Sequence, residues 1–241
     1  MKARTLILPS LLTLLPAQAT SLLARDYDCK TDCSNTTCPP ATGAAHIIVS
    51  RASAEKPGTG RLGPVADAVV SACPGSDVVA NPYPALLDGY VGSETAGIDN
   101  LTLIVREYRE CCPEAGKLVL LGYSQGAQVT ADFLCGRSEV GFPVAAVVLM
   151  GDPSFVEDVP WDRGNASNKS FFPRLDNIAC LPVADKMISY CDAEDYFCDN
   201  GTSADALAIH LGYVEEYGAQ AVEYIVDKIG ECDGAGSSAW K

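Results

Sequence analysis

The chain contains the stretch Lys117-Leu-Val-Leu-Leu-Gly-Tyr-Ser-Gln-Gly-Ala-Gln128, whose pattern indicates a strand, a tight turn and a helix. The apolar run is broken at Gly122, and apolar residues at helical spacing follow from Val129 onward. Ser124 therefore lies on the turn, in the setting of a nucleophile elbow. Glycines are needed on either side because larger side chains would collide with the neighbouring strand and helix. The positive end of the helix points at the serine, where it would stabilise developing negative charge.

A short motif such as Gly122-Tyr-Ser-Gln-Gly126 also occurs in glycine-rich turns that only close an ordinary strand-helix unit. The apolar strand before it and the helix after it favour a nucleophilic serine over this alternative. A nucleophilic serine needs a histidine as its base and an acid that orients the histidine. Both must come from elsewhere in the chain.

Strand patterns alternate with helix patterns along the chain. Strands are predicted at residues 44–50, 77–80, 118–121, 144–150 and 187–190. Helices are predicted around residues 65–70, 98–111, 125–134 and 211–229, and residues 154–186 are expected to be irregular. This alternation predicts one α/β domain with a central parallel sheet and helices on both faces. In such a sheet the active site lies beyond the carboxyl ends of the strands.

The chain has only two histidines, His46 and His210, that could serve as the base. His46 lies inside the first predicted strand, where a histidine is more often a core residue with its hydrogen bonds satisfied. His210 lies in the predicted loop just before the last helix, so we expect His210 to be the base.

The acid is expected in the segment from Cys191 to Cys198, which offers Asp192, Glu194 and Asp195. A disulfide between the ends of this loop would hold a carboxylate still while it orients the imidazole. The alternative is a solvated acidic loop. The order serine, acid, histidine is that of α/β-hydrolases.

The N-terminal pattern predicts export. Residues 1–19 have a basic start, an apolar core and a small-x-small cleavage site, which together indicate a signal peptide too short to span a membrane. Residues 20–37 are expected to form a cysteine-bearing arm, residues 38–230 the hydrolase domain and residues 231–241 a flexible tail. Five N-x-Ser/Thr sequons agree with a secreted glycoprotein: Asn35, Asn100, Asn165, Asn168 and Asn200.

Composition narrows the function further. The chain has 11 cysteines, which indicates several disulfides in an extracellular protein, with at least one cysteine left over. A zinc site is disfavoured because there are only two histidines and no pair of C-x-x-C knuckles. The formal net charge of −14 is unfavourable for binding nucleic acid or anionic membranes, so we expect neither as a partner.

Three motifs, Gly122–Gly126, Cys191–Cys198 and Ala208-Ile-His-Leu-Gly-Tyr213, together resemble the cutinase family of secreted fungal serine esterases. The resemblance extends from about residue 38 to residue 229. It implies an α/β-hydrolase in which Ser124 is the nucleophile, Asp195 the acid and His210 the base. It further implies an oxyanion hole formed by Ser53 and by the backbone N–H of Gln125. No metal or organic cofactor is required by such a mechanism.

The resemblance also implies disulfide pairings. It suggests that Cys191 pairs with Cys198, Cys38 with Cys111 or Cys112, and Cys135 with Cys180. It assigns no partner to four cysteines, at positions 29, 33, 73 and 232.

Within the family, the segment Leu149–Pro153 and the first-strand pair Ala45-His46 look more like the acetylxylan esterase branch. Phe197, with Tyr196 beside it, is expected to narrow the acyl site so that only short acyl groups fit. The expected substrate is therefore an acylated polysaccharide such as acetylated xylan, and the protein is expected to act as a monomer. Two alternatives stay open: a cutinase that hydrolyses aliphatic polyester, and a non-catalytic secreted wall-binding protein.

Overall fold

The computed structural model describes residues 31–34, 36–136 and 144–232. The predicted signal peptide, Cys29, the sequon at Asn35 and nearly all of the predicted tail lie outside these residues. Among the described residues, no helix is both long enough and apolar enough to cross a membrane.

Six strands and five α-helices make up the described domain. The strands are β1 (Ala45–Ser50), β2 (Asp77–Ala80), β3 (Lys117–Tyr123), β4 (Val144–Met150), β5 (Asp162–Gly164) and β6 (Met187–Cys191). The α-helices are α1 (Gly63–Ala72), α2 (Tyr90–Cys111), α3 (Gln125–Gly136), α4 (Ala206–Leu211) and α5 (Tyr213–Ile229). Two 3-10 helices, η1 (Gly60–Leu62) and η2 (Ile178–Lys186), complete the described elements.

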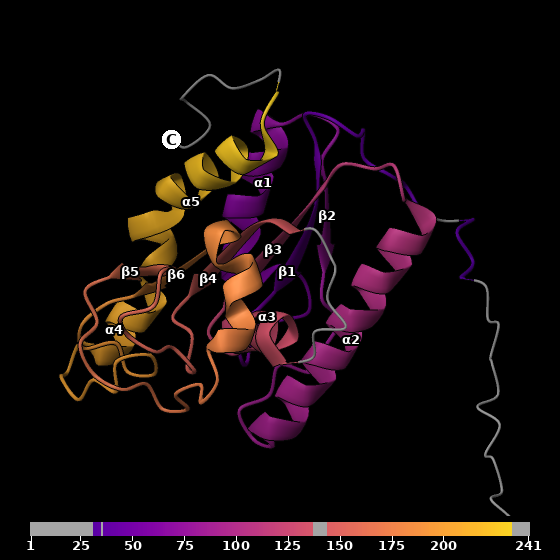
Figure 1. Cartoon of the computed structure of the whole chain (residues 1–241). Coiled ribbons are helices and arrows are strands. Elements are labelled where there is room, and N and C mark those ends of the chain that lie inside the picture. Colours follow the sequence, from indigo (N-terminus) through magenta and orange to yellow (C-terminus); the bar gives the residue numbers. More distant parts are fainter. Residues whose placement is uncertain (1–30, 35, 137–143, 233–241) are drawn as a thin grey trace, which may run out of the picture. The chain divides into compact units, whose positions relative to one another are not determined.

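All six strands form one sheet in the order β2-β1-β3-β4-β6-β5, and every neighbouring pair is parallel. Helices α1 and α5 cover one face of the sheet and α2 and α3 cover the other, as Figure 1 shows. The predicted α/β fold, with a parallel sheet between two helical layers, is therefore confirmed.

The central strand β3 explains why the core has two halves. Its residues Val119, Leu121 and Tyr123 pack in the apolar cluster beneath α1 and α5. The alternate residues Leu118 and Leu120 pack in the cluster beneath α2 and α3. Because successive side chains of a strand point to opposite faces, a strand buried on both faces must be apolar throughout, as this run is.

Five disulfides join described cysteines. Three of them link the cysteines for which the family resemblance suggests pairings: Cys38–Cys112, Cys135–Cys180 and Cys191–Cys198. The other two are Cys33–Cys111 and Cys73–Cys232. Three of these cysteines had no predicted partner, and Cys111 was one of the two candidates for pairing with Cys38. The adjacent cysteines at the end of α2 thus hold the N-terminal segment at two points.

The structure differs from the sequence-based prediction in two segments. Residues 154–186 were expected to be irregular, yet they contain β5 and η2. Strand β5, at the edge of the sheet, reads Asp-Arg-Gly and has no apolar pattern, because only its backbone pairing with β6 makes it a strand. The last helix was expected from Leu211, but a separate short helix α4 ends there and α5 begins after Gly212.

Candidate active site

Ser124 occupies a left-handed turn between β3 and α3. Its φ angle is +53°, a conformation that a residue with a side chain adopts only when the surrounding structure holds it there. The backbone N–H of Ser124 donates a hydrogen bond to the carbonyl oxygen of Met150 at 2.8 Å, which ties the turn to the end of β4. The side chain of Ser124 therefore lies beyond the carboxyl edge of the sheet.

The two glycines beside Ser124 are required by close backbone contacts. A Cβ added to Gly122 would lie 2.5 Å from the carbonyl oxygen of Gly126, in the first turn of α3. A Cβ added to Gly126 would lie 2.0 Å from the carbonyl oxygen of Ser50, at the end of β1. No side-chain rotation relieves either contact, because the atoms met are backbone atoms.

The side chain of His210 lies between Ser124 and Asp195. Its Nε2 is 2.9 Å from Ser124 Oγ, and its Nδ1 is 2.8 Å from Asp195 Oδ2. An ionised carboxylate only accepts hydrogen bonds, so the proton of a neutral imidazole belongs on Nδ1 and Nε2 is free to accept from the serine hydroxyl. His210 was expected in a loop; it lies instead in α4, whose short span the hydrophobic pattern did not reveal.

The carboxylate of Asp195 is fully buried and held by several donors. Its Oδ1 accepts hydrogen bonds from the backbone N–H groups of Phe197 at 2.7 Å and Cys198 at 2.8 Å. Its Oδ2 accepts from the hydroxyl of Tyr213 at 2.8 Å as well as facing His210. The disulfide between Cys191 and Cys198 closes the loop that carries Asp195.

The other two acids of this loop have different partners. Asp192 accepts a hydrogen bond from the hydroxyl of Tyr217 at 2.7 Å. Glu194 accepts one from the backbone N–H of Ser203 at 3.2 Å. Of the three carboxylates that the sequence left open, Asp195 is the one in contact with His210.

His46 lies at the opposite end of the sheet from Ser124. It is the second residue of β1, whose start is paired with the start of β3, whereas Ser124 follows the end of β3. Its Nδ1 is 2.9 Å from Asp77, and its ring stacks on Tyr108 with centroids 4.1 Å apart. Within the part of the chain that the structure describes, no group of three His, Cys, Asp or Glu side chains could hold a metal ion.

Of the two predicted oxyanion-hole residues, one lines the cavity in front of Ser124 and the other, Gln125, directly follows Ser124 in the chain. Ser53 lines this cavity, and its hydroxyl is buried without a hydrogen-bond partner among the described residues. Gln125 is the first residue of α3, where backbone N–H groups have no intrahelical acceptor. The side chain of Gln125 is fixed, since it donates to the carbonyl oxygen of Leu86 at 3.0 Å and accepts from Ser93 at 3.0 Å.

Buried hydrogen bonds fix the loop that carries Ser53. The guanidinium of Arg51, which is almost fully buried, donates to the carbonyl oxygens of Tyr83 at 2.7 Å and Glu55 at 3.1 Å. The carboxylate of Glu55 in turn accepts from the backbone N–H of Ala52 at 2.8 Å. These hydrogen bonds anchor the loop backbone on both sides of Ser53.

The cavity in front of Ser124 has a volume of about 280 Å³, and half of its lining residues are aromatic. It is lined by Ser53, Leu87, Tyr90, Ser124, Pro153, Phe171, Phe172 and Phe197. The ring of Phe197 lies 4.6 Å from the ring of His210, centroid to centroid. Tyr196, expected to share this role, is 43% exposed and does not line the cavity; it packs on the outer side of Phe171 and Phe197.

Sequence reasoning missed five of the lining residues: Leu87, Tyr90, Pro153, Phe171 and Phe172. They lie in or beside two segments without hydrophobic periodicity, the loop before α2 and the stretch 154–186. No sequence pattern therefore assigned them to the site. The adjacent pair Phe171-Phe172 inside a polar, irregular stretch was the one available signal, because large apolar residues in such a stretch need a place to pack.

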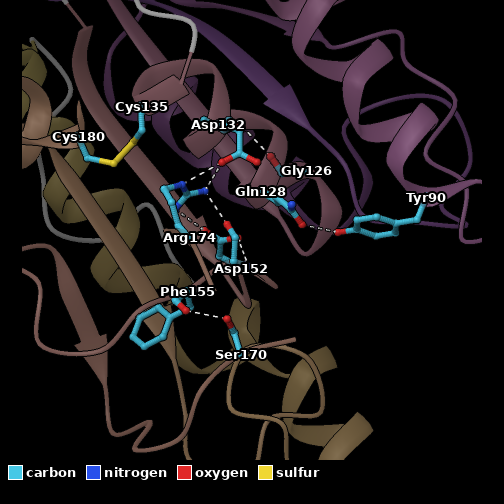
Figure 2. A network of polar contacts seen from close by, with 12 residues as sticks. Tyr90, Gly126, Gln128, Asp132, Cys135, Asp152, Phe155, Ser170, Arg174 and Cys180 are labelled. Atoms are coloured by element: carbon cyan, nitrogen blue, oxygen red, sulfur yellow. Dashed lines mark hydrogen bonds and ion pairs between the residues drawn. A yellow bond between two sulfur atoms is a disulfide. The ribbon is translucent and has the colours of Figure 1, made fainter. Parts of the chain in front are cut away.

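A buried ionic network anchors this aromatic segment to the sheet and to α3. The backbone N–H of Phe172 donates to the carbonyl oxygen of Pro153 at 2.8 Å. Two residues further on, the guanidinium of Arg174 donates to Asp132 at 2.7 Å and lies 3.7 Å from Asp152 (Figure 2). Burial raises the pKa of Asp152, and the charge of Arg174 opposes that rise. The network thus links the cavity wall to charges that are costly to separate.

Comparisons with known proteins agree with one another. Residues 40–229 match the family model named Cutinase. Acetylxylan esterase 2 of Talaromyces purpureogenus is 34% identical over 209 residues, which cover 78% of this chain and 87% of that protein. An acetylxylan esterase of Hypocrea jecorina is 31% identical over 236 residues, covering 89% and 75%. A solved structure of an acetylxylan esterase has a TM-score of 0.71 at 34% identity and covers 80% of this chain and 100% of its own.

Proposed function

The chain belongs to the cutinase family and is a carboxylic ester hydrolase, and from this premise we propose that it removes acetyl groups from plant cell-wall polysaccharide such as acetylated xylan. The observation that carries the proposal is the hydrogen-bonded series from Ser124 through His210 to Asp195. The similarity to acetylxylan esterases supports the choice of substrate. We further propose that the protein is exported and acts as a monomer, and the five disulfides among the described residues support an extracellular location.

In the proposed reaction, His210 accepts the proton of Ser124 as the serine oxygen attacks the ester carbonyl. The negative charge that develops on the carbonyl oxygen is held by Ser53 and by the backbone N–H of Gln125. The bond to the alcohol breaks, and the alcohol leaves with the proton that His210 returns. A water molecule, deprotonated by His210, then attacks the acyl-enzyme and releases the acid and the free Ser124.

The size of the cavity favours a short acyl group. Its volume of about 280 Å³ lies at the small end of ligand cavities and must hold the acyl group together with part of the alcohol. Phe197 stands beside His210 and occupies space that a longer acyl chain would need. An acetyl group is small enough to fit in such a site with its carbonyl carbon within reach of the serine oxygen.

One observation favours the second candidate, a cutinase that hydrolyses aliphatic polyester. The mouth of the cavity is bordered by exposed apolar side chains, of which Leu87 is 60%, Phe172 50% and Phe171 40% exposed. Exposed apolar groups beside a site are typical of surfaces that contact an apolar partner. The same side chains could instead stack against the faces of sugar rings, so the acyl-length preference must decide between the two substrates.

The deciding experiment measures initial rates on the p-nitrophenyl esters of acetate, butyrate and laurate, followed by acetate release from acetylated xylan. The wild type is compared with Ser124→Ala and with Ser71→Ala, a remote serine on α1. We expect rates that fall steeply with chain length, activity on the xylan, and loss of both in Ser124→Ala alone. Flat or rising rates with chain length would favour the cutinase. No Ser124-dependent activity on any ester would leave the non-catalytic wall-binding protein as the better description.

A further inference from the structure

Tyr213 shares with His210 a single oxygen atom of Asp195. The Tyr213 hydroxyl donates to Asp195 Oδ2 at 2.8 Å, and His210 Nδ1 lies 2.8 Å from the same atom. We propose that Tyr213 is a positioning residue of the hydrolytic site, which fixes the Asp195 carboxylate and withdraws part of its charge from His210. This inference rests on the proposed function, because it gives Tyr213 a role through the Asp195-His210 pair.

The hydrogen-bond partners of the Tyr213 hydroxyl indicate that its single proton is donated to Asp195. The hydroxyl oxygen accepts a hydrogen bond from the backbone N–H of Asp192 at 2.9 Å. A phenol hydroxyl has one proton to give, and a carboxylate oxygen is the strongest acceptor within its reach. The hydroxyl therefore passes the polarisation of a backbone N–H on to the carboxylate.

Burial favours the protonated, hydrogen-bond-donating form of the Tyr213 hydroxyl. The side chain is fully buried, and burial, followed by the charge of Asp195, raises the pKa of the Tyr213 hydroxyl well above its usual value. A neutral phenol in contact with a carboxylate stabilises the charged form of that carboxylate.

The rings of Tyr213 and His210 are also held together sterically. A Cβ added to Gly151 would lie 2.8 Å from Cε1 of His210 and 3.1 Å from Cε2 of Tyr213. The glycine after β4 therefore lets the backbone pack against both rings at once. Gly212 separates the helix that carries His210 from the helix that begins at Tyr213, so the two side chains converge on one carboxylate.

The expected consequence is a change in the pH dependence of the reaction. Without the hydroxyl, Asp195 keeps its full charge for His210 and binds the protonated imidazole more strongly, so a higher pH is needed to obtain the neutral base. The substitution alters none of the other titratable or charged side chains around the pair, although the backbone N–H of Asp192 loses its acceptor; these side chains are Arg61, Tyr123, Asp192, Glu194, Asp199 and Tyr217. A shift of the acid limb can thus be assigned to the missing hydroxyl.

Tyr213→Phe tests the proposal, and Tyr217→Phe is its matched control. Tyr217 is a neighbouring tyrosine on the same helix, and its hydroxyl donates to Asp192 rather than to Asp195. The full chain is assayed for kcat and KM on p-nitrophenyl acetate across the pH range. We expect Tyr213→Phe to lower kcat about tenfold with little change in KM, and to move the acid limb of kcat/KM up by roughly half a pH unit. Tyr217→Phe should leave the acid limb where it is.

A second measurement does not depend on turnover. The proton NMR resonance of His210 Nδ1–H reports its hydrogen bond to Asp195, and we expect Tyr213→Phe to shift it downfield while Tyr217→Phe does not. An acid limb and a resonance that coincide with the wild type in Tyr213→Phe would overturn the inference. A wild type without Ser124-dependent activity would instead refute the proposed function, and the resonance alone would then decide whether Tyr213 controls the Asp195-His210 contact.

Discussion

The carbonyl oxygen of Ser50 lies 2.0 Å from the position that a Cβ of Gly126 would occupy. This contact brings the start of α3 against the end of β1, so that the turn with Ser124 and the loop with Ser53 border the same cavity. The backbone of β1, β3 and α3 is therefore packed to its limit where Ser124 is held. Van der Waals packing of this kind transmits any increase in side-chain volume directly to the site.

Gly126→Ala should disrupt the site because its methyl group cannot be accommodated without moving β1 away from α3. We expect the free energy of unfolding to fall by about 3 kcal/mol and the esterase rate to fall at least tenfold. Chemical denaturation and p-nitrophenyl acetate hydrolysis measure the two effects. Gly136→Ala, in the last turn of the same helix, meets no atom within 4 Å and should change neither by much. Equal behaviour of the two variants would contradict this account.

Asp199 should stabilise the loop that carries Asp195. Its buried carboxylate accepts hydrogen bonds from the backbone N–H groups of Ser167, Asn168 and Glu194, at 2.8, 2.6 and 2.8 Å. All of these partners are donors, so an amide in place of the carboxylate would point its own NH₂ group at one of them. We expect Asp199→Asn to lower the free energy of unfolding by about 2 kcal/mol.

The effect of Asp199→Asn should depend on pH. Burial alone would raise the pKa of Asp199, but the hydrogen bonds outweigh burial and hold the pKa below its usual value. The carboxylate therefore adds stability above about pH 4, and this stability is lost as the pH falls through the lowered folded-state value. Denaturation at pH 7 and pH 3 measures the difference, with Asp205→Asn at an exposed position as the control. A difference that grows toward low pH would rule the explanation out.

How much could be predicted from the sequence depended on whether a feature has a local pattern. The strands and the Ser124 turn follow from short apolar runs and glycine spacing, and His210 was identified because the chain has only one other histidine. Asp195 could be singled out only through the family resemblance, since neighbouring acids share its loop. Strand β5 and the cavity residue Phe172 escaped prediction because backbone pairing and tertiary hydrogen bonds place them, and neither leaves a periodic signal.

Asp162 should make the folded protein less stable as the pH rises. Burial raises the pKa of this half-buried carboxyl to about 6, and one of its oxygens has no hydrogen-bond partner among the described residues. Between about pH 4 and pH 6 the folded state binds more protons than the unfolded state, so stability falls with rising pH across this window. We expect Asp162→Asn to be about 1 kcal/mol more stable than the wild type at pH 8, with no advantage at pH 4.

Urea denaturation of Asp162→Asn at several pH values measures this effect. The substitution Asp67→Asn, at an exposed position on α1, controls for the change in net charge. A stability gain for Asp162→Asn that is the same at pH 4 and pH 8 would mean that the ionised carboxylate is not the cause.

Phe197 should set the length of the acyl group that the site accepts. Its ring lies beside His210 and lines the cavity, so replacing it with valine removes aromatic volume where the acyl chain would extend. We expect Phe197→Val to raise the ratio of butyrate to acetate hydrolysis roughly tenfold, because each added methylene that fits an apolar site gains 1–3 kcal/mol. The ratio of kcat/KM values on the two p-nitrophenyl esters is the measurement.

Tyr196→Val is the matched comparison, because Tyr196 is the adjacent aromatic residue and does not line the cavity. Its ring centroid lies 4.8 Å from that of Phe197. Its loss removes support from outside the wall but adds no space beside His210, so the butyrate-to-acetate ratio should change less than about twofold. An effect of Tyr196→Val as large as that of Phe197→Val would place the restriction in the rigidity of the whole aromatic wall. In that case the volume of Phe197 would no longer explain the acyl preference, and the anchoring of Phe172 through Pro153 would become the feature to vary next.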